Sequence, residues 1–324
     1  MPKMSFAAAL VDALAIAMAE DPTVSIIGAY PLGLGPQRTL MDRVRERFAD
    51  RIIDPPIAEA GVAGLGAGAA MAGVRPFVDL GTASFSYLAW SQLVNEAAVA
   101  HYMSDGRITV PVVYHMLHGV RGGGAPQHSQ SPQAMLWNAP GLEIVAPSTP
   151  ADVKGLLLTA IRSNNPTVVV NHAKLMGIEG EVPAGDRGIP FGRADIKRPG
   201  RDVTVVATSF MVQETLKAAE ALARDGIEIE VVDPRTQVPF DEAAILDSVA
   251  RTGRLVVVDE CPLRGGVASE IAASVAEHGF RSLKAPILRV ARADTPVPFS
   301  APLEAAVTPD PAKIAAAVRR VMAA

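Results

Sequence analysis

Residues 142–172, LEIVAPSTPADVKGLLLTAIRSNNPTVVVNH, contain the unit from which the rest of the fold can be predicted. Both ends of this stretch are short and rich in β-branched residues, as buried strands are. The middle has helical spacing, with Pro150 at a first-turn position and Asn164–Asn165 at the exit. Strand, helix and strand in this order predict a βαβ unit around a mostly parallel sheet.

The same alternation continues on both sides of this unit. In the first half we predict further strands over 23–30, 75–82 and 110–117, and helices over 5–19, 61–73 and 87–103. A second series has strands over 203–209, 227–235, 254–260 and 286–291, and helices over 211–224, 241–251, 265–279 and 311–323. The pattern predicts an α/β fold with two doubly wound domains.

Length and composition bound the domains and the class of protein. A chain of 324 residues exceeds the usual size of one domain. The stretch MGIEGEVPAGDRGIPFGRADIKRPGRD, residues 176–202, is rich in glycine, proline and charge, which is typical of a linker. We therefore predict one domain over 1–180, a linker over 181–200 and a second domain over 201–324.

Charge and cysteine content exclude several classes. A net charge of −4 argues against a nucleic-acid-binding protein. No apolar stretch approaches the roughly 20 residues that a membrane span needs, and Asp12 and Glu20 interrupt the apolar first helix. The single cysteine, Cys261, excludes an intramolecular disulfide and favours a reducing, cytoplasmic setting.

A lone carboxylate, Glu59, stands ahead of a run of glycine, alanine and valine, PPIAEAGVAGLGAGAAMAG. GLGAGA at 64–69 formally fits a dinucleotide fingerprint, with Asp79 downstream, but prolines 55 and 56 end any strand well before Gly64. Dinucleotide binding is therefore the weakest alternative. Glu59 itself has two interpretations: an acid that favours the helix dipole, or a carboxylate that shares a proton with a ligand in an apolar pocket.

Six motifs occur in the order of one known family: RIIDPPIAEAGVAGLGAGAAMAGVRPFVDL, FSYLAWSQLVNEAAVAHYMSDG, GAPQHSQSPQAMLWNAPGLEIVAPSTPADVKGLL, AIRSNNPTVVV, IEVVDPRTQVPFD and RLVVVDE. From about residue 5 to its end, the chain resembles the β subunits of the thiamine-diphosphate-dependent, decarboxylating first component of 2-oxo acid dehydrogenase complexes. The pyruvate, branched-chain and acetoin enzymes belong to that family. The resemblance implies a transketolase-like pyrimidine-binding domain followed by a transketolase C-terminal-like domain.

The resemblance also assigns site residues. Glu59 would hydrogen-bond a ring nitrogen of the cofactor's aminopyrimidine, and Phe85 would pack on that ring. Ile57 would form a pocket wall, as would Leu88, which stands where the family commonly has glutamine. His128, in the polar loop APQHSQS, would handle the acyl intermediate. A structural potassium ion would be held by backbone carbonyls of Val112, Ala160, Ile161, Ser163 and Asn165. His115 and His118 lie three apart in a strand, so we reject a zinc site there.

A second half-site is missing from this chain. In the family a GDG motif, followed by an asparagine pair, holds the diphosphate through magnesium, and this sequence has no GDG. The resemblance therefore implies a separate GDG-bearing α subunit in an α2β2 heterotetramer, and in large complexes a lipoyl acyltransferase core. The implied reaction is decarboxylation of a 2-oxo acid, or cleavage of an acetoin-like substrate, with transfer of the acyl group to a lipoyl carrier.

Several positions depart from the family pattern. Gly28-Ala29-Tyr30 replaces Gly-Glu-[DE], His115 replaces an arginine, and Asn171–His172 replaces a glutamate after the VVV strand. These departures leave open a catalytically silent assembly subunit. The C-terminal subunit of a split transketolase is also open, although QHSQS argues against it.

Overall fold

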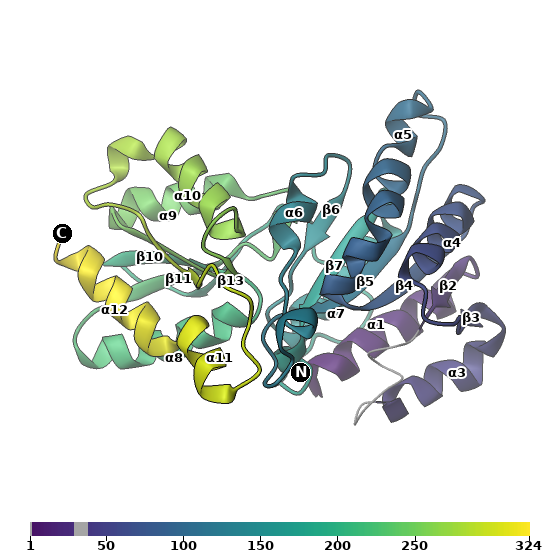
Figure 1. Cartoon of the computed structure of the whole chain (residues 1–324), viewed down its shortest axis with the longest axis horizontal. Helices are drawn as coiled ribbons and strands as arrows, with labels where there is room; N and C mark the ends of the chain where they lie inside the picture. Colours follow the sequence, from purple (N-terminus) through teal and green to yellow (C-terminus); the bar gives the residue numbers. More distant parts are fainter. Residues whose placement is uncertain (1, 29–37) are drawn as a thin grey trace. The chain divides into compact units, whose positions relative to one another are not determined.

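A computed structural model describes residues 2–28 and 38–324, and the chain forms two compact units (Figure 1). Unit 1 comprises Met1–His118 and Met135–Phe191, and unit 2 comprises Gly119–Ala134 and Gly192–Ala324. The predicted α/β fold with two parallel-sheet domains is confirmed. The predicted range 1–180 places residues 119–134 in the first domain. In the structure this excursion groups with the second half of the chain.

Unit 1 is built on parallel strands whose carboxyl ends share one edge of the sheet. Their order is β6 (Glu143–Val145), β7 (Thr167–His172), β5 (Val113–His118), β4 (Arg75–Thr82), β2 (Val24–Ile27) and β3 (Ile52–Ile53). The central strands are buried on both faces, which explains their nearly continuous apolar sequences. A separate antiparallel pair joins β1 (Lys3–Ser5) to β8 (Glu179–Glu181).

Helices cover both faces of this sheet (Figure 1). Helix α1 (Phe6–Glu20) begins at Ser5, whose hydroxyl accepts the Ala8 amide, and packs against α7 (Pro150–Arg162). Helix α7 begins at Thr149, which accepts the Asp152 amide at 3.1 Å, with proline in its first turn as predicted. On the other face α4 (Glu59–Met71) packs against β4. Unit 1 also contains α3 (Asp42–Phe48), and α6 (Gln133–Trp137) spans the sequence junction between the two units.

The helix predicted over 87–103 was wrong as a single continuous element. The chain instead forms the 3₁₀ turn η3 (Ala83–Ala89), the π-helical turn η4 (Gln92–Ala97) and the short helix α5 (Ala100–Met103). Within η3, the buried Ser86 hydroxyl donates to the Ala83 carbonyl at 2.6 Å, a side-chain bond that competes with regular helix bonding. Turns of this kind are common beside functional sites.

Unit 2 carries a sheet in the order β14 (Leu288–Arg292), β13 (Leu255–Pro262), β10 (Val203–Ala207), β11 (Ile229–Asp233) and β9 (Asp195–Arg198). Only β9, on the edge, runs antiparallel within this sheet. The helices of unit 2 are α8 (Phe210–Arg224), α9 (Glu242–Thr252), α10 (Val267–His278), α11 (Ala301–Val307) and α12 (Pro311–Met322), and β12 (Thr236–Val238) is a further strand.

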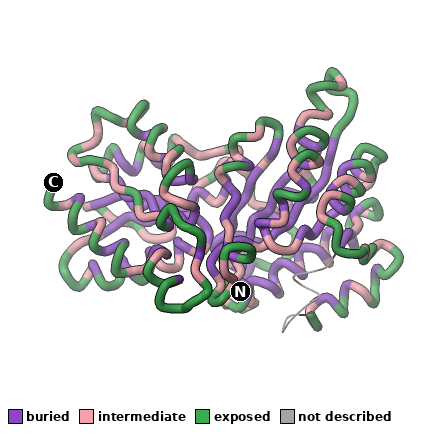
Figure 2. The backbone as a smooth tube through the Cα atoms, in the orientation of Figure 1, coloured by how far each residue is buried: buried purple, intermediate pink, exposed green. Residues whose placement is uncertain are grey.

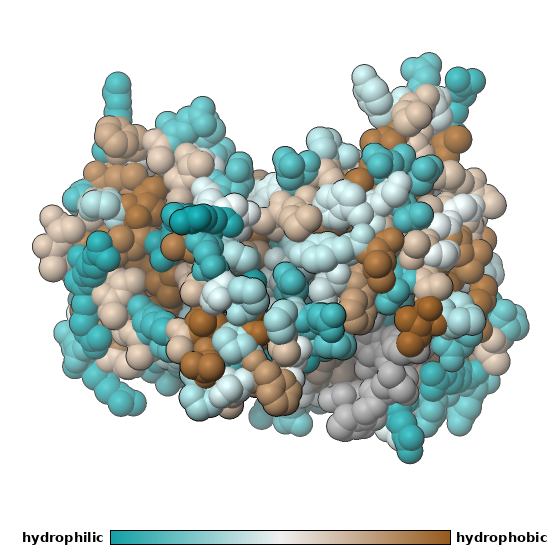
Figure 3. Space-filling model, in the orientation of Figure 1, coloured by the Kyte–Doolittle hydropathy of each residue, from teal (hydrophilic) through white to brown (hydrophobic). Residues whose placement is uncertain are grey.

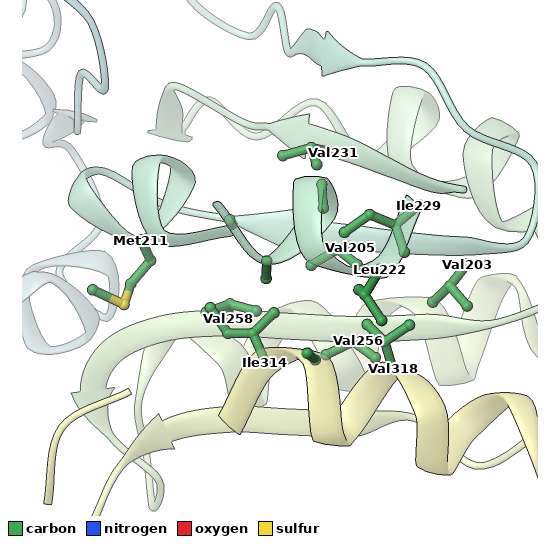
Figure 4. Close-up of a cluster of buried hydrophobic side chains, with 14 of the residues drawn as sticks. Val203, Val205, Met211, Leu222, Ile229, Val231, Val256, Val258, Ile314 and Val318 are labelled. Carbon is green, nitrogen blue, oxygen red and sulfur yellow. The ribbon is translucent and has the colours of Figure 1, made fainter. Parts of the chain in front are cut away.

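An apolar cluster forms the core of unit 2 between its sheet, α8 and α12 (Figure 4). Val205 and Val258 of the sheet meet Leu222 of α8 and Ile314 of α12, and all four are fully buried. The buried strands of both sheets appear as purple tubes in Figure 2. In the part of the chain that the structure describes, no helix combines the length and apolarity needed to cross a membrane.

Candidate functional site

The carboxyl edge of the unit-1 sheet carries the four residues that were predicted to contact the pyrimidine ring. The segment after β3 carries Ile57 and Glu59, and η3, directly after β4, carries Phe85 and Leu88. Because all these strands are parallel, segments that leave their carboxyl ends emerge at one edge. In open α/β sheets this is the edge at which ligands bind.

Glu59 is the first residue of α4 and is half-buried. The preceding N-cap residue, Ala58, has no side chain that could cap the helix. The free amides of the first turn can therefore bind an external acceptor or the carboxylate of Glu59 itself. Among the described residues, none donates a hydrogen bond to the Glu59 carboxylate. Proximity to the helix N-terminus favours its negative charge, so both sequence interpretations of this acid are compatible with its position.

The side chains around this acid are apolar and unusually exposed. Ile57 is 66% exposed and Leu88 is 64% exposed, whereas the Phe85 residue is half-buried. Exposed large apolar side chains at a sheet edge are typical of a surface that a ligand or a partner chain covers.

A buried chain of polar side chains lies in the sheet beneath this edge. Asn171 on β7 is 3.0 Å from His115 Nε2 through its Nδ2 atom, and His115 Nδ1 is 3.1 Å from Asp79 Oδ1 on β4. His115 and Asn171 are fully buried, and Asp79 nearly so. Sequence analysis treated His115 and Asn171 as separate departures from the family pattern. The structure makes them direct partners and adds Asp79, which sequence reasoning had considered only as a ribose-binding acid.

Two histidines further along the same strands also meet in the interior. The rings of His118 on β5 and His172 on β7 are 4.9 Å apart, edge to face, and both are buried. His172 Nδ1 accepts the Lys174 amide at 3.0 Å. Within residues 2–28 and 38–324, no group of three or more histidine, cysteine or acidic side chains is placed to hold a metal ion.

His128 belongs to unit 2, where it ends the short turn η5 (Pro126–His128) and is exposed. The turn follows Ala125, whose φ of 51° is unusual for a residue with a side chain. The His128 amide donates to the Gly124 carbonyl at 3.2 Å. A strained, ordered loop that presents one exposed imidazole has the features of a functional rim.

The predicted potassium ligands lie around the exit of α7. The carbonyls of Ile161 and Ser163 converge on Nη1 of Arg75, at 3.1 and 2.7 Å, and Arg75 Nη2 reaches Asn164 Oδ1 at 2.6 Å. Sequence analysis missed this arginine. A guanidinium group therefore uses one lone pair on each of these two carbonyls.

Two features of the sequence remain, the departure at residues 28–30 and the single cysteine. The departure Gly28-Ala29-Tyr30 falls on Ala29 and Tyr30, which lie outside the described residues. Cys261 is buried, its sulfur is 3.3 Å from the Ser131 carbonyl, and burial raises its pKa well above the usual thiol value. A protonated, enclosed thiol is structural.

Comparison with known protein families accounts for both units. Residues 2–177 match the family model of the transketolase pyrimidine-binding domain, and residues 192–314 match that of the transketolase C-terminal domain. A solved structure described as a split-gene transketolase, inactive β4 tetramer, has a TM-score of 0.81 at 23% identity, with 99% of this chain and 98% of that chain covered. At that identity the likeness shows the fold alone.

Curated relatives are more similar in sequence. The β subunit of acetoin:2,6-dichlorophenolindophenol oxidoreductase from Cupriavidus necator is 41% identical, covering 99% of this chain and 98% of the relative. The β subunit of 2-oxoisovalerate dehydrogenase from Bacillus subtilis is 39% identical, with 96% and 97% covered. The β subunit of the pyruvate dehydrogenase E1 component from Rickettsia conorii is 40% identical, with 97% and 96% covered.

Proposed function

Starting from the premise that the chain belongs to the family of E1 β subunits of pyruvate, acetoin and branched-chain dehydrogenases, we propose that it is the β subunit of a thiamine-diphosphate-dependent 2-oxo acid or acetoin dehydrogenase. Such an enzyme decarboxylates or cleaves its substrate and passes the acyl group to a lipoyl carrier. The observation that carries the proposal is the half-buried Glu59 among exposed apolar side chains at the ligand-binding edge of a parallel sheet.

These residues fit one end of the implied cofactor. When bound, thiamine diphosphate supplies a carbon nucleophile that attacks the substrate carbonyl. The Glu59 carboxylate has no hydrogen-bond donor among the described residues, so it is able to hold a proton at a pyrimidine ring nitrogen. Ile57, Phe85 and Leu88 offer apolar surface that would contact the ring and exclude water, which strengthens the hydrogen bond of the acid.

His128 is proposed as a second catalytic residue. Its exposure and its place in a glycine-flanked loop suit a group that exchanges a proton with a substrate or an acyl intermediate. An imidazole is the side chain best suited to do this near neutral pH.

A potassium ion at the α7 exit is proposed, with the backbone carbonyls of Val112, Ala160, Ile161, Ser163 and Asn165 as its ligands. The Val112 carbonyl accepts the Thr167 amide at 2.9 Å, the Ala160 carbonyl accepts the Ser163 amide at 3.2 Å, and Arg75 binds Ile161 and Ser163. Each carbonyl keeps a second lone pair, so a potassium ion would share this cluster with the guanidinium group.

An α subunit is proposed as the partner, in an α2β2 heterotetramer. The sequence lacks a GDG motif to hold magnesium and diphosphate, so that end of the cofactor would be bound by another chain. The exposed face of α4 supports a partner here: Ala58, Gly61, Leu65, Gly68 and Met71 are exposed, and none is polar. Apolar surface over α4 and α5 is visible in Figure 3. The small residues allow another backbone to approach closely.

Cellular setting and alternatives follow from the same observations. The single buried Cys261 fits the reducing cytoplasm. A lipoyl acyltransferase core is proposed as a further partner.

Transfer of ketol units, as in a split transketolase, is a second candidate function, supported only by the shared fold. A non-catalytic assembly role is the third, since Gly28-Ala29-Tyr30 departs from the family's Gly-Glu-[DE] pattern.

The test is co-expression with the GDG-bearing α subunit and assay of 2-oxo acid or acetoin turnover with a dye acceptor. Glu59→Gln keeps the shape and removes the shared proton, so we expect turnover to fall by about 10²–10⁴-fold. Glu270→Gln is the matched control, because Glu270 is an exposed acid in the first turn of α10. Equal turnover in both variants would show that Glu59 serves only the helix dipole.

A further inference from the structure

The buried chain Asp79–His115–Asn171 connects three neighbouring strands on one face of the unit-1 sheet. Asp79 pairs with His115 in the β4–β5 register, and Asn171 pairs with Leu117, two residues beyond His115. Because side chains alternate along strands, these three side chains share a face. Phe77 lies on that face as well and stacks on the His115 ring at 5.3 Å. The histidine is therefore held by a ring contact and by a hydrogen bond at each nitrogen.

The hydrogen bonds fix the tautomer of His115. Asn171 approaches Nε2 with its amide nitrogen, which only donates, so Nε2 is the acceptor. The ring proton is then on Nδ1 and is donated to Asp79 Oδ1. The neutral tautomer with its proton on Nδ1 satisfies both contacts. The other neutral tautomer would place two donors face to face at Nε2 and two acceptors face to face at Nδ1.

Asp79 also binds the backbone of its own strand. Its Oδ1 atom also accepts the Gly81 amide at 3.1 Å. Gly81 has a φ of 71° and lies in a β-bulge, since Asp79 opposes His115 and Thr82 already opposes Leu117. The bulge is the last feature of β4 before η3 begins at Ala83. The carboxylate therefore holds the point at which the chain turns toward Phe85 and Leu88.

Two acceptors in the Asp79–His115–Asn171 network lack donors among the described residues. They are Asp79 Oδ2 and Asn171 Oδ1, at opposite ends of the network. A buried acceptor without a donor is costly, so a purely structural network would be expected to satisfy them. Functional sites commonly retain such costs.

We infer that Asp79, His115 and Asn171 are positioning residues for the candidate site. The Nδ1-protonated imidazole orients the Asp79 carboxylate, which anchors the Gly81 bulge and so sets the position of the η3 segment that carries Phe85. The role of that segment toward thiamine diphosphate rests on the proposed function, whereas the anchoring of the bulge does not.

The first measurement needs no cofactor. Full-length chain with ¹⁵N-labelled histidine and glycine is studied by NMR, with the signal of His115 assigned from His115→Asn. We expect a protonated Nδ1 and a bare Nε2, together with slow hydrogen exchange at the Gly81 amide. A proton on Nε2, or fast exchange at Gly81 in the wild-type chain, would contradict the inference.

The second measurement reverses one hydrogen bond. Asn171→Asp offers Nε2 an acceptor in place of a donor, so we expect faster exchange at Gly81. In the assembly with the α subunit, the dissociation constant for thiamine diphosphate should rise about tenfold, the factor for loss of one buried hydrogen bond. His115→Asn keeps the donor to Asp79, and its affinity should stay closer to that of the wild type.

Asn95→Asp is the control, because it makes the same change from amide to carboxylate at an exposed position of η4. If Asn171→Asp speeds Gly81 exchange while cofactor affinity stays at the control value, the network is structural only and the inference fails. If the wild-type assembly binds no thiamine diphosphate, the proposed function fails instead. Exchange at Gly81 then still decides whether Asp79, oriented by His115, anchors the bulge. Should Asn171→Asp fold poorly, the tautomer of His115 in the wild-type chain decides alone.

Discussion

The carboxyl edges of the two parallel sheets differ in how far the chain itself covers them. In unit 2 the edge is closed by the chain's own excursion: the Val120 amide donates to Glu260 Oε1 at 2.5 Å, and the Gly123 amide to Glu304 Oε2 at 3.0 Å. Asp259, also at this edge, accepts the Thr208 hydroxyl and the Cys261 amide. In unit 1 the corresponding edge keeps Ile57 and Leu88 exposed.

The difference shows that a doubly wound sheet does not by itself create a binding site. Acids at the unit-2 edge are enclosed and have donors in their own unit, and burial raises the pKa of the Asp259 carboxyl. Glu59 is half-buried and has no donor among the described residues. Topology supplies an edge in both cases, and side-chain satisfaction decides which edge remains available for a ligand.

The largest expected effect in this comparison is on stability. Leu222→Ala opens a cavity in the closed core of unit 2, where Leu222 is fully buried, and should lower the free energy of unfolding by about 2–5 kcal/mol. Leu88→Ala makes the same change at the exposed edge of unit 1 and should cost less than about 0.5 kcal/mol. Denaturant unfolding of the isolated chain measures both. Similar losses would mean that Leu88 is already packed.

A smaller effect is expected within α4, between its packed and exposed faces. A Cβ at Gly66 would lie 2.4 Å from Cγ2 of Val78, whereas a Cβ at Gly68 meets nothing within 4 Å. Gly68→Ala should therefore be more stable than Gly66→Ala by about 1–3 kcal/mol, since the gain in helix propensity is common to both.

The same pair of variants tests the partner surface. If the exposed face of α4 contacts the α subunit, Gly68→Ala should weaken co-purification of the two chains while it stabilises the isolated one. Normal assembly of Gly68→Ala would place the interface elsewhere. Thermal melting of the isolated chain and size-exclusion chromatography of the co-expressed chains provide the two readouts.

The smallest effect is expected on the exposed surface of unit 2. His278 Nδ1 is 2.6 Å from Glu242 Oε1, and this hydrogen bond raises the pKa of His278. The pKa of Glu242 is lowered, first by its hydrogen bond from Ser274 and then by His278. The raised histidine contributes stability that is full below its unfolded pKa and lost as pH rises through its folded pKa. The lowered acid contributes stability that is lost as pH falls through its own folded pKa.

The pair should therefore stabilise most at mildly acidic pH, between the ordinary values of glutamate and histidine. His278→Gln should lower the melting temperature at pH 5.5 more than at pH 8.5. The expected difference is small because the pair is exposed to solvent. A uniform decrease at both pH values would indicate that the loss comes from packing and not from charge.

Much of the fold was accessible from periodicity. β4 was predicted with the ends that it has in the structure, and α7 with its start at Pro150, because the strand and helix signals were strong. The helix predicted over 87–103 was wrong as one continuous element, since its helical composition gives no sign of the Gly81 bulge that precedes it. The excursion 119–134 was missed because its partners, Glu260 and Glu304, are far away in sequence.

Sequence alone determined the family, the order of the two domains and the identity of the candidate acid, because motifs and periodicities are local properties. Tertiary structure alone decided that His115, Asn171 and Asp79 form one unit, and that Arg75 binds the carbonyls at the α7 exit. Both arrangements join residues from strands or turns that are distant in the chain. Hydrogen-bond partnership between distant segments depends on strand order and register, which local sequence does not encode.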